Sequence, residues 1–214
     1  VTPETINHEQ RYLSAVFSEL MRLGAWHGEN PILAIRQMKT DQTELQFLSL
    51  DDVKKLLSEC QKSTNTHCYP VALLCLATGA RWDEAESLPR HAVYGGKVHY
   101  HKTKNGQSRA VPISPDVQKV ILEQGLPSGR LFMSCRSAFR SAYERCGFDT
   151  PRQLTHILRH TFASHFMMAG GDILTLQRIL GHSSIQVTMR YAHLSPSHLQ
   201  AAVQLSPLSQ MIAL

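Results

Sequence analysis

Glycines divide this chain of 214 residues into short segments with helical spacing of apolar side chains, and this division restricts the fold more than any other feature. The apolar stripe of residues 5–23 ends at Gly24, and comparable segments stop at Gly79, Gly170 and Gly181. Glycine readily adopts the left-handed backbone conformation that closes many helices, so each position predicts a helix C-terminus. The pattern therefore predicts a chain built from short helices.

One stretch departs from the helical spacing and has the pattern of a β-hairpin. Val98 and Tyr100 alternate with polar residues before an Asn-Gly pair at 105–106, and the alternation resumes at Ala110. Asn-Gly is a strong signal for a tight turn between antiparallel strands. The predicted fold class is therefore mainly α with a small antiparallel β-sheet, an α+β fold.

Serine residues predict where several helices begin. Ser49 is followed three residues later by Asp52, a spacing that allows the two side chains to cap a helix start reciprocally. Ser114 precedes a proline, which is favoured at the first position of a helix. Either Ser183 or Ser184 can cap the helix that we predict for the segment SSIQVTMRYAHL.

The first 40 residues differ from the rest of the chain in how they can be packed. The apolar face of residues 5–23 has few apolar neighbours in the sequence around it, and the polar segment that follows contains Asn30-Pro31, typical of a linker. We therefore expect residues 1–40 to be the tail of a truncated domain plus a linker. Residues 41–214 are expected to form the main domain.

Composition excludes several classes of protein. The formal net charge of +5 permits a polyanionic partner without requiring one. The five cysteines are an odd number and form no CxxC pair, so neither a disulfide framework nor a zinc ribbon is indicated. No apolar run reaches the roughly 18 residues that span a bilayer, and the start at Val1 shows no signal-peptide pattern. We expect a fragment of a longer cytoplasmic protein with reduced thiols.

The segment LTHILRHTFASHF, residues 154–166, first suggests a metal site. His156 and His160 have the spacing of the zinc ligands on a metalloprotease helix, but no glutamate follows His156. Arg159 lies on the same helical face as His156 and would repel a divalent cation. An arginine and a histidine near a helix N-terminus are better suited to an anion such as phosphate, so no metal is expected. The alternative is a buried pair satisfied by carbonyls and carboxylates.

Further polar residues stand at junctions between predicted elements. Arg81 follows the helix break at ATGAR, Lys104 is at the hairpin tip, and His182 follows a helix-ending glycine. Tyr191 lies nine residues beyond His182. Each has an ordinary structural alternative: Arg81 can pair with Glu84, the lysine can be an exposed turn residue, and the histidine can cap a helix.

Together these segments resemble one family. TGARWDEAESL, KTKNGQSRAVPI, HILRHTFASHF and LGHSSIQVTMRYAHL are similar to the four catalytic boxes of the tyrosine recombinases, in the same order and with the usual spacing. Within that family the chain most resembles integrases of temperate bacteriophages, from about residue 45 to the C-terminus. The resemblance implies that residues 1–40 hold the tail helix of a truncated core-binding domain plus a linker, and that residues 41–214 form the catalytic domain.

The resemblance also implies roles for individual residues on the phosphate side of the site. Arg81 and Arg159 would clamp the non-bridging oxygens of the scissile phosphate, and Glu84 would support the first arginine. Lys104 would protonate the departing 5′-oxygen, with Lys102 on the same strand as a second choice.

The remaining roles concern the nucleophile and the histidines. Tyr191 would attack the phosphate and form a 3′-phosphotyrosyl link to DNA. His156 would act as an acid–base partner, and His182 would donate a hydrogen bond to the phosphate. His160, about 100° from Arg159 around the helix, is expected to pack inward in a structural role.

The resemblance further implies the partners of the protein. These are double-stranded DNA attachment sites, a homotetramer on DNA in which residues 196–214 dock on a neighbouring protomer, and DNA-bending accessory proteins. No cofactor and no membrane are expected, and the activity would be integration and excision of phage DNA in the host cytoplasm. The alternatives are a type IB topoisomerase-like enzyme, a DNA-binding protein that has lost catalysis, and a zinc hydrolase.

Overall fold

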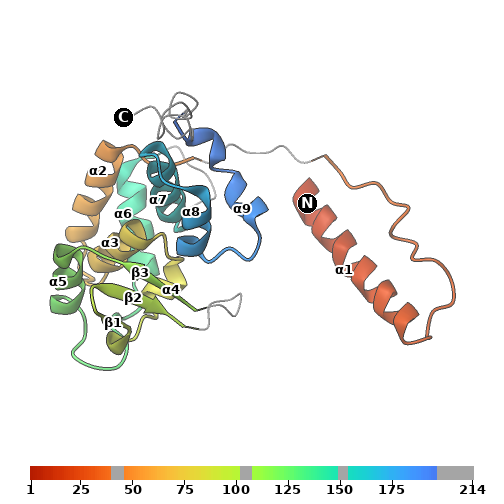
Figure 1. Cartoon of the computed structure of the whole chain (residues 1–214), viewed down its shortest axis with the longest axis horizontal. Helices are drawn as coiled ribbons and strands as arrows, with labels where there is room; N and C mark the ends of the chain where they lie inside the picture. The colour runs from red at the N-terminus through yellow and green to blue at the C-terminus, as the bar shows by residue number, and fades with distance from the viewer. Residues whose placement is uncertain (40–45, 102–107, 149–153, 197–214) are drawn as a thin grey trace, which may run out of the picture. The chain divides into compact units, whose positions relative to one another are not determined.

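The computed structural model describes residues 1–39, 46–101, 108–148 and 154–196, and it divides the chain into two units, Val1–Glu44 and Leu45–Leu214 (Figure 1). Among the described helices, none has both the length and the apolar character needed to cross a membrane.

The first unit consists of a long helix and a segment that folds back onto it. The helix, α1, spans Pro3–Arg22. The Asn7 amide donates to the Met38 carbonyl at 2.8 Å and its oxygen accepts from the Met38 N–H at 2.8 Å, while the Asn30 amide donates to the Ser14 carbonyl at 2.9 Å. The segment that we predicted as a linker thus folds back onto α1 as far as Met38, held by the amides of two buried asparagines that bind backbone groups.

The second unit is mainly helical with a small antiparallel sheet, as predicted. Its α-helices are α2 (Leu50–Gln61), α3 (Cys68–Thr78), α4 (Trp82–Glu86), α5 (Pro115–Glu123), α6 (Arg136–Cys146), α7 (His156–Met168), α8 (Ile173–Leu180) and α9 (Ile185–Met189). Two short 3₁₀ turns, η1 (Arg90–Ala92) and η2 (Ala192–Leu194), accompany strands β1 (Val93–Tyr94), β2 (Lys97–Tyr100) and β3 (Arg109–Pro112).

The sheet has the order β1-β2-β3, and its middle and last strands are the predicted hairpin. Val98 on β2 faces Val111 on β3, and both side chains are buried. The first strand was not predicted, because it has two residues and no alternation of its own. Gly95 and Gly96 connect it to β2, and both have positive φ, the conformation that a two-residue hairpin turn requires.

Helix starts agree with the predicted caps, but one predicted helix is too long. Ser49 and Asp52 form a reciprocal capping box, and Ser184 rather than Ser183 caps α9. This helix ends at Met189, so Tyr191 stands between it and η2 instead of on a continuous helix. The turn tightens there because the Tyr191 N–H donates to the carbonyl three residues earlier, which carries the tyrosine ring inward.

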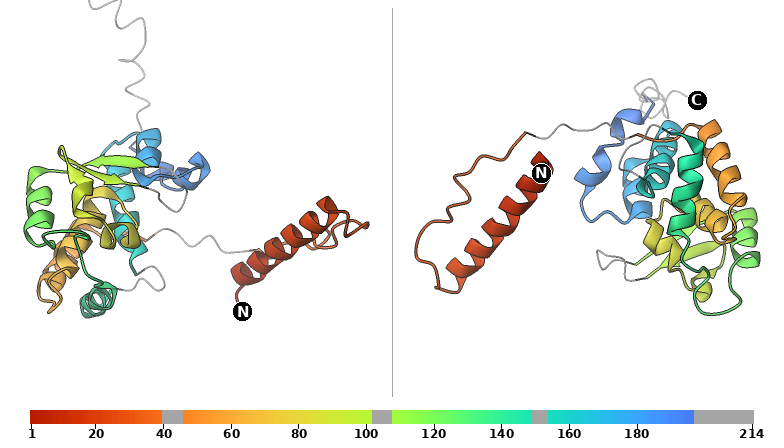
Figure 2. Two further views of the ribbon diagram at one scale, coloured as in Figure 1. Left: turned by 90° about the horizontal axis from the view of Figure 1, so that it is seen from below. Right: turned by 180° about the vertical axis from the view of Figure 1, so that it is seen from behind.

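The core is arranged around α3, whose side chains are buried on nearly all sides and which contacts α2, α5, α6 and α7. This burial explains why the α3 sequence is apolar throughout instead of having one apolar stripe. In every view, α8 and α9 lie at the end of the unit opposite α5 (Figure 2). A second cluster on α7 and α8 is formed by Ala163, Met167, Leu176, Leu180 and Tyr191.

Candidate active site

Arg159 joins the ends of three helices. It lies in the first turns of α7, its side chain is buried, and its residue is 4% exposed. One terminal nitrogen donates to the Gly79 carbonyl at 2.8 Å, and the other donates to the Leu180 carbonyl at 2.8 Å. These carbonyls belong to the C-terminal ends of α3 and α8, where the helix dipole is negative. The guanidinium is thus held in one orientation and still has N–H groups available for an anion.

A glycine is required at the first of these helix ends. Gly79 has a φ of +64°, and a Cβ there would lie 2.6 Å from Phe162 Cδ1 and 2.7 Å from Leu180 Cδ2. Both the left-handed backbone and this close approach exclude larger residues. The break in the sequence at Gly79 therefore also provides the carbonyl that orients Arg159.

Arg81 is positioned by the carboxylate that the sequence analysis associated with it. Glu84 accepts from the Arg81 backbone N–H at 3.0 Å and from its guanidinium at 3.2 Å. Arg109 at the start of β3 binds the same carboxylate at 2.6 Å, and its guanidinium lies over the Tyr100 ring at 4.5 Å from the centroid. Glu84 therefore bridges two arginines from different elements.

Arg109 was not predicted to belong to this site. The available signal was strand alternation, because Arg109 is two residues from the buried Val111 and so faces the same side of the sheet. An arginine at an inward-facing strand position requires a partner, here Glu84. Burial raises the pKa of Glu84, but the hydrogen bond and charge of Arg109, with help from Arg81, bring that pKa below its ordinary value.

Two of the predicted histidines lie in the electrostatic field of these arginines. Burial, followed by the charges of Arg159 and Arg81, lowers the pKa of His156. The same causes lower the pKa of His182 to about 4, and its Nδ1 is 2.8 Å from the Thr188 hydroxyl. Both imidazoles are therefore neutral at neutral pH, and a bound anion would raise their pKa values.

The contacts of Arg159 place the four residues in one region, because it binds the carbonyls of Gly79 and Leu180, which lie two residues before Arg81 and His182. Burial, and then the charge of Arg81, lowers the pKa of Arg159 to about 10, which leaves it charged at neutral pH. The positive potential that Arg81 and Arg159 produce in this region is suited to binding one phosphate group. The structure thus brings together Arg81, Arg159, His156 and His182 from α4, α7 and the α8–α9 loop.

Tyr191 is buried against α7, with 1% of the residue exposed. Burial raises the pKa of its hydroxyl, while the charges of Arg159 and Arg190 partly counter this effect. The hydroxyl is 2.6 Å from His160 Nδ1, a contact that the predicted inward packing of His160 did not include. Helical spacing gave the angular position of His160, but it could not show which segment lies opposite that side of α7.

Some predicted features lie outside the described residues. Lys104 and Lys102 are among them, as is the C-terminal segment 197–214. Within the described ranges, no group of three or more histidine, cysteine, aspartate or glutamate side chains is arranged to hold a metal ion. Two histidines of α7 have protein partners, in the contacts of His160 with Tyr191 and of His165 with the Leu48 carbonyl.

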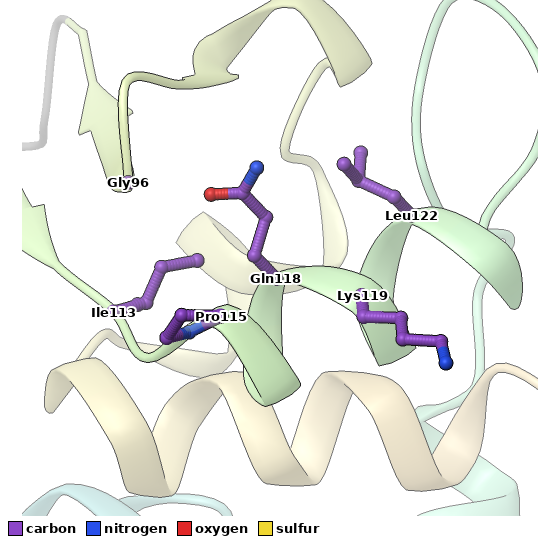
Figure 3. A pocket seen from close by; sticks show the side chains of 6 residues that line it. All are labelled: Gly96, Ile113, Pro115, Gln118, Lys119 and Leu122. Carbon is purple, nitrogen blue, oxygen red and sulfur yellow. The ribbon is translucent and has the colours of Figure 1, made fainter.

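Two hollows are relevant to where a ligand can lie. A hollow of about 340 Å³ lies between the β1–β2 turn and α5, and its lining includes none of Arg81, Arg159, His156, His182 and Tyr191 (Figure 3). A hollow of about 480 Å³ lies between β3 and α8 and is lined in part by Arg109, Gly181 and His182. The second one therefore adjoins the arginine and histidine cluster.

A mainly helical domain with a small antiparallel sheet is the fold of tyrosine recombinase catalytic domains, and the clustered arginines and histidines and the tyrosine near its C-terminal side are the residue types that the resemblance implied. The model of the phage integrase family matches residues 46–198, and the model of the phage integrase N-terminal domain matches residues 1–39. The chain belongs to the phage integrase family.

Individual relatives are phage integrases. The chain is 73% identical to a putative integrase of Pseudomonas phage Pf1, over 99% of this chain and 64% of that protein. It is 50% identical to the integrase of Escherichia phage 186, over 97% of this chain and 62% of that one. The chain thus spans 60% to 64% of the length of four phage integrases that it matches.

A solved structure supports the fold assignment. The catalytic domain of bacteriophage HP1 integrase superimposes with a TM-score of 0.73 at 48% identity. The match covers 78% of this chain and 98% of that domain.

Proposed function

We propose that this chain is the catalytic part of a site-specific DNA recombinase that integrates and excises phage DNA. It would cleave and rejoin DNA through a 3′-phosphotyrosyl link at Tyr191. The observation that carries the proposal is the convergence of two oriented arginines and two neutral histidines on the part of the second unit that holds Tyr191. Membership of the phage integrase family supports it.

The arginines are suited to stabilise the pentacoordinate transition state. Its non-bridging oxygens gain negative charge, and fixed donors in a water-poor site stabilise that charge most strongly. Arg159 is held by two carbonyls and Arg81 by Glu84, so neither guanidinium needs to reorganise when a phosphate binds. Arg81 and Arg159 would bind the two non-bridging oxygens, and His182 would donate a third hydrogen bond.

The leaving 5′-oxygen requires a proton. Lys104, from the connection between β2 and β3, would supply it, with Lys102 as the second candidate. His156 would serve as an acid–base partner in the same reaction. Since the phenol is a good leaving group, a DNA hydroxyl can attack the phosphotyrosine and restore the phosphodiester without ATP.

Strand exchange determines the proposed partners. The chain would act on double-stranded attachment sites in the bacterial cytoplasm as a tetramer, together with DNA-bending proteins. The first unit would belong to the core-binding domain, and residues 196–214 would dock on a neighbouring protomer. Deletion of 196–214 should then impair cooperative assembly on DNA more than nicking, and equal loss of both would contradict the docking role.

A suicide substrate tests the central proposal. A duplex with the phage attachment core and a nick beside the scissile phosphate releases the 5′-fragment and traps the covalent adduct. Wild-type protein should form this adduct and Tyr191→Phe should not. Tyr100→Phe removes another buried phenol, which contacts Thr78, and should retain adduct formation. An adduct with Tyr191→Phe would refute the proposal, and site-independent relaxation of plasmid DNA would indicate a topoisomerase-like activity instead.

A further inference from the structure

The hydroxyl of Tyr191 has a nitrogen partner that none of the roles above uses. His160 Nδ1 lies 2.6 Å from the Tyr191 oxygen, which is the separation of a short hydrogen bond. The rings are tilted with centroids 6.0 Å apart, so they meet through their polar atoms and do not stack. His160 is therefore in direct contact with the atom that would attack the phosphate.

The surroundings of His160 keep its ring neutral. Burial, and then the charges of Arg190, His156 and Arg159, lowers the pKa of His160 to about 4. A neutral imidazole has one nitrogen that accepts a hydrogen bond and one that donates. The raised pKa of Tyr191 keeps the phenol protonated, so the phenol can donate to Nδ1 of the tautomer that carries its proton on Nε2.

We propose that His160 is a catalytic residue that orients the Tyr191 hydroxyl and accepts its proton as the phenol attacks the scissile phosphate. This inference rests on the proposed function, because it assigns a group to the nucleophile of that reaction. In the forward step the Tyr191 O–H bond breaks and its proton moves to His160 Nδ1. The tyrosine oxygen bonds to phosphorus, the bond from phosphorus to the 5′-oxygen breaks, and that oxygen receives a proton from the lysine.

The transfer has to accompany the attack. His160 has a pKa of about 4 and burial holds Tyr191 above its ordinary value, so complete transfer beforehand would be strongly unfavourable. Bond formation to phosphorus makes the phenol oxygen far more acidic, and the phosphate charge raises the basicity of the imidazole. In the rejoining step, His160 returns the proton to the departing phenolate, and the histidine regains its neutral form.

Two substitutions separate proton acceptance from a purely structural contact. In His160→Asn the amide oxygen occupies roughly the place of Nδ1 and still accepts a hydrogen bond, but it takes up no proton at neutral pH. His160→Leu removes the acceptor entirely. The matched control is His165→Asn, a histidine on the same helix whose described partners are the Leu48 carbonyl and the Phe47 ring.

The measurement is the single-turnover rate of adduct formation on the nicked suicide duplex at saturating protein. We expect both His160 variants to be at least about 100-fold slower, the usual range for loss of a general base. The DNA affinity of all three variants should stay within about threefold of wild type. The adduct-formation rate of His165→Asn should also stay within about threefold of wild type, a difference that is small compared with the loss expected for the His160 variants. The Asn variant should also gain rate with increasing pH, as the phenol ionises without help. A His160→Asn rate within about threefold of wild type, with no change in pH profile, would overturn the inference.

A substrate with a 5′-bridging sulfur identifies the side of the phosphate on which His160 acts. Sulfur departs without protonation, so it rescues loss of the acid and does not rescue loss of the base. We expect the defect of both His160 variants to persist on this substrate, and restoration of the wild-type rate would refute the assignment. Nitrogen-15 NMR of the free protein should show an unprotonated His160 Nδ1, and a protonated Nδ1 would likewise overturn it.

The outcomes distinguish this inference from the proposed function. Absence of a Tyr191-dependent adduct with wild-type protein means that the proposed function fails, and the inference fails with it. A Tyr191-dependent adduct that His160→Asn forms at the wild-type rate refutes the inference alone.

Discussion

Substitution of Arg109 by methionine should destabilise the second unit strongly. The methionine keeps most of the apolar stem that packs over Tyr100 but removes the guanidinium that binds Glu84 at 2.6 Å. The two side chains are only 7% and 13% exposed, so water cannot replace the lost partner. Glu84 would retain Arg81, but that contact is longer, at 3.2 Å, and its arginine is more exposed.

The size of the expected loss in stability follows from the state of Glu84, which would be a buried carboxylate with only one of its two arginine partners. Removing one partner of a buried ion pair costs about 3–5 kcal/mol, a large part of the roughly 5–15 kcal/mol that stabilises a typical domain. A change of this size corresponds to a decrease in Tm of about 6–20 °C for a domain of this length. Loss of Arg109 should also raise the pKa of Glu84, because the arginine is what holds that pKa below its ordinary value.

Thermal unfolding followed by circular dichroism measures this effect. The control is Arg136→Met, which removes a surface pair whose side chains are 46% and 80% exposed and which should cost less than about 1 kcal/mol. Arg109→Met should also cost less in a Glu84→Gln background, since no buried charge is then left without its partner. A Tm decrease for Arg109→Met no larger than that for Arg136→Met would refute the reasoning.

Three further predictions concern stability. His160 and His182 have pKa values of about 4 in the folded chain, below the ordinary 6.5, so the unfolded chain takes up protons first as the pH falls. Stability should be complete above about pH 6.5 and decrease toward pH 4, by roughly 2 kcal/mol per histidine at pH 5, and urea unfolding that is unchanged between pH 7 and 5 would contradict this. Gly79→Ala should lower stability by at least about 2 kcal/mol, because it combines a strained backbone with a clash against Phe162, and an unchanged Tm would be inconsistent with this. Ser49→Ala should cost about 1 kcal/mol through loss of the helix cap, measurable by the same unfolding assay, whereas no change would show that the cap is dispensable.

Features set by a few adjacent residues were predictable from the sequence. The caps at Ser49 and Ser114, the helix end at Gly181 and the hairpin pairing of β2 with β3 all agree with the structure. Each depends on local backbone geometry or on side-chain periodicity, which the order of residues determines without reference to distant parts of the chain. The four boxes identified the family for the same reason, since each is a short contiguous pattern.

Features that depend on which distant segments meet were decided by the tertiary structure. The β1 strand is too short to have a pattern, and α9 ends before Tyr191, whose ring is buried. The contact between Arg109 and Glu84 joins a strand to a helix 25 residues earlier, and the contact between His160 and Tyr191 spans 31 residues. Periodicity states only which way a side chain faces on its own element, whereas its partner is determined by packing. The sequence alone therefore determined the family, the helices and the candidate catalytic residues. Only the packed chain decided which groups hold those residues in place, because hydrogen bonds and ion pairs require proximity in space.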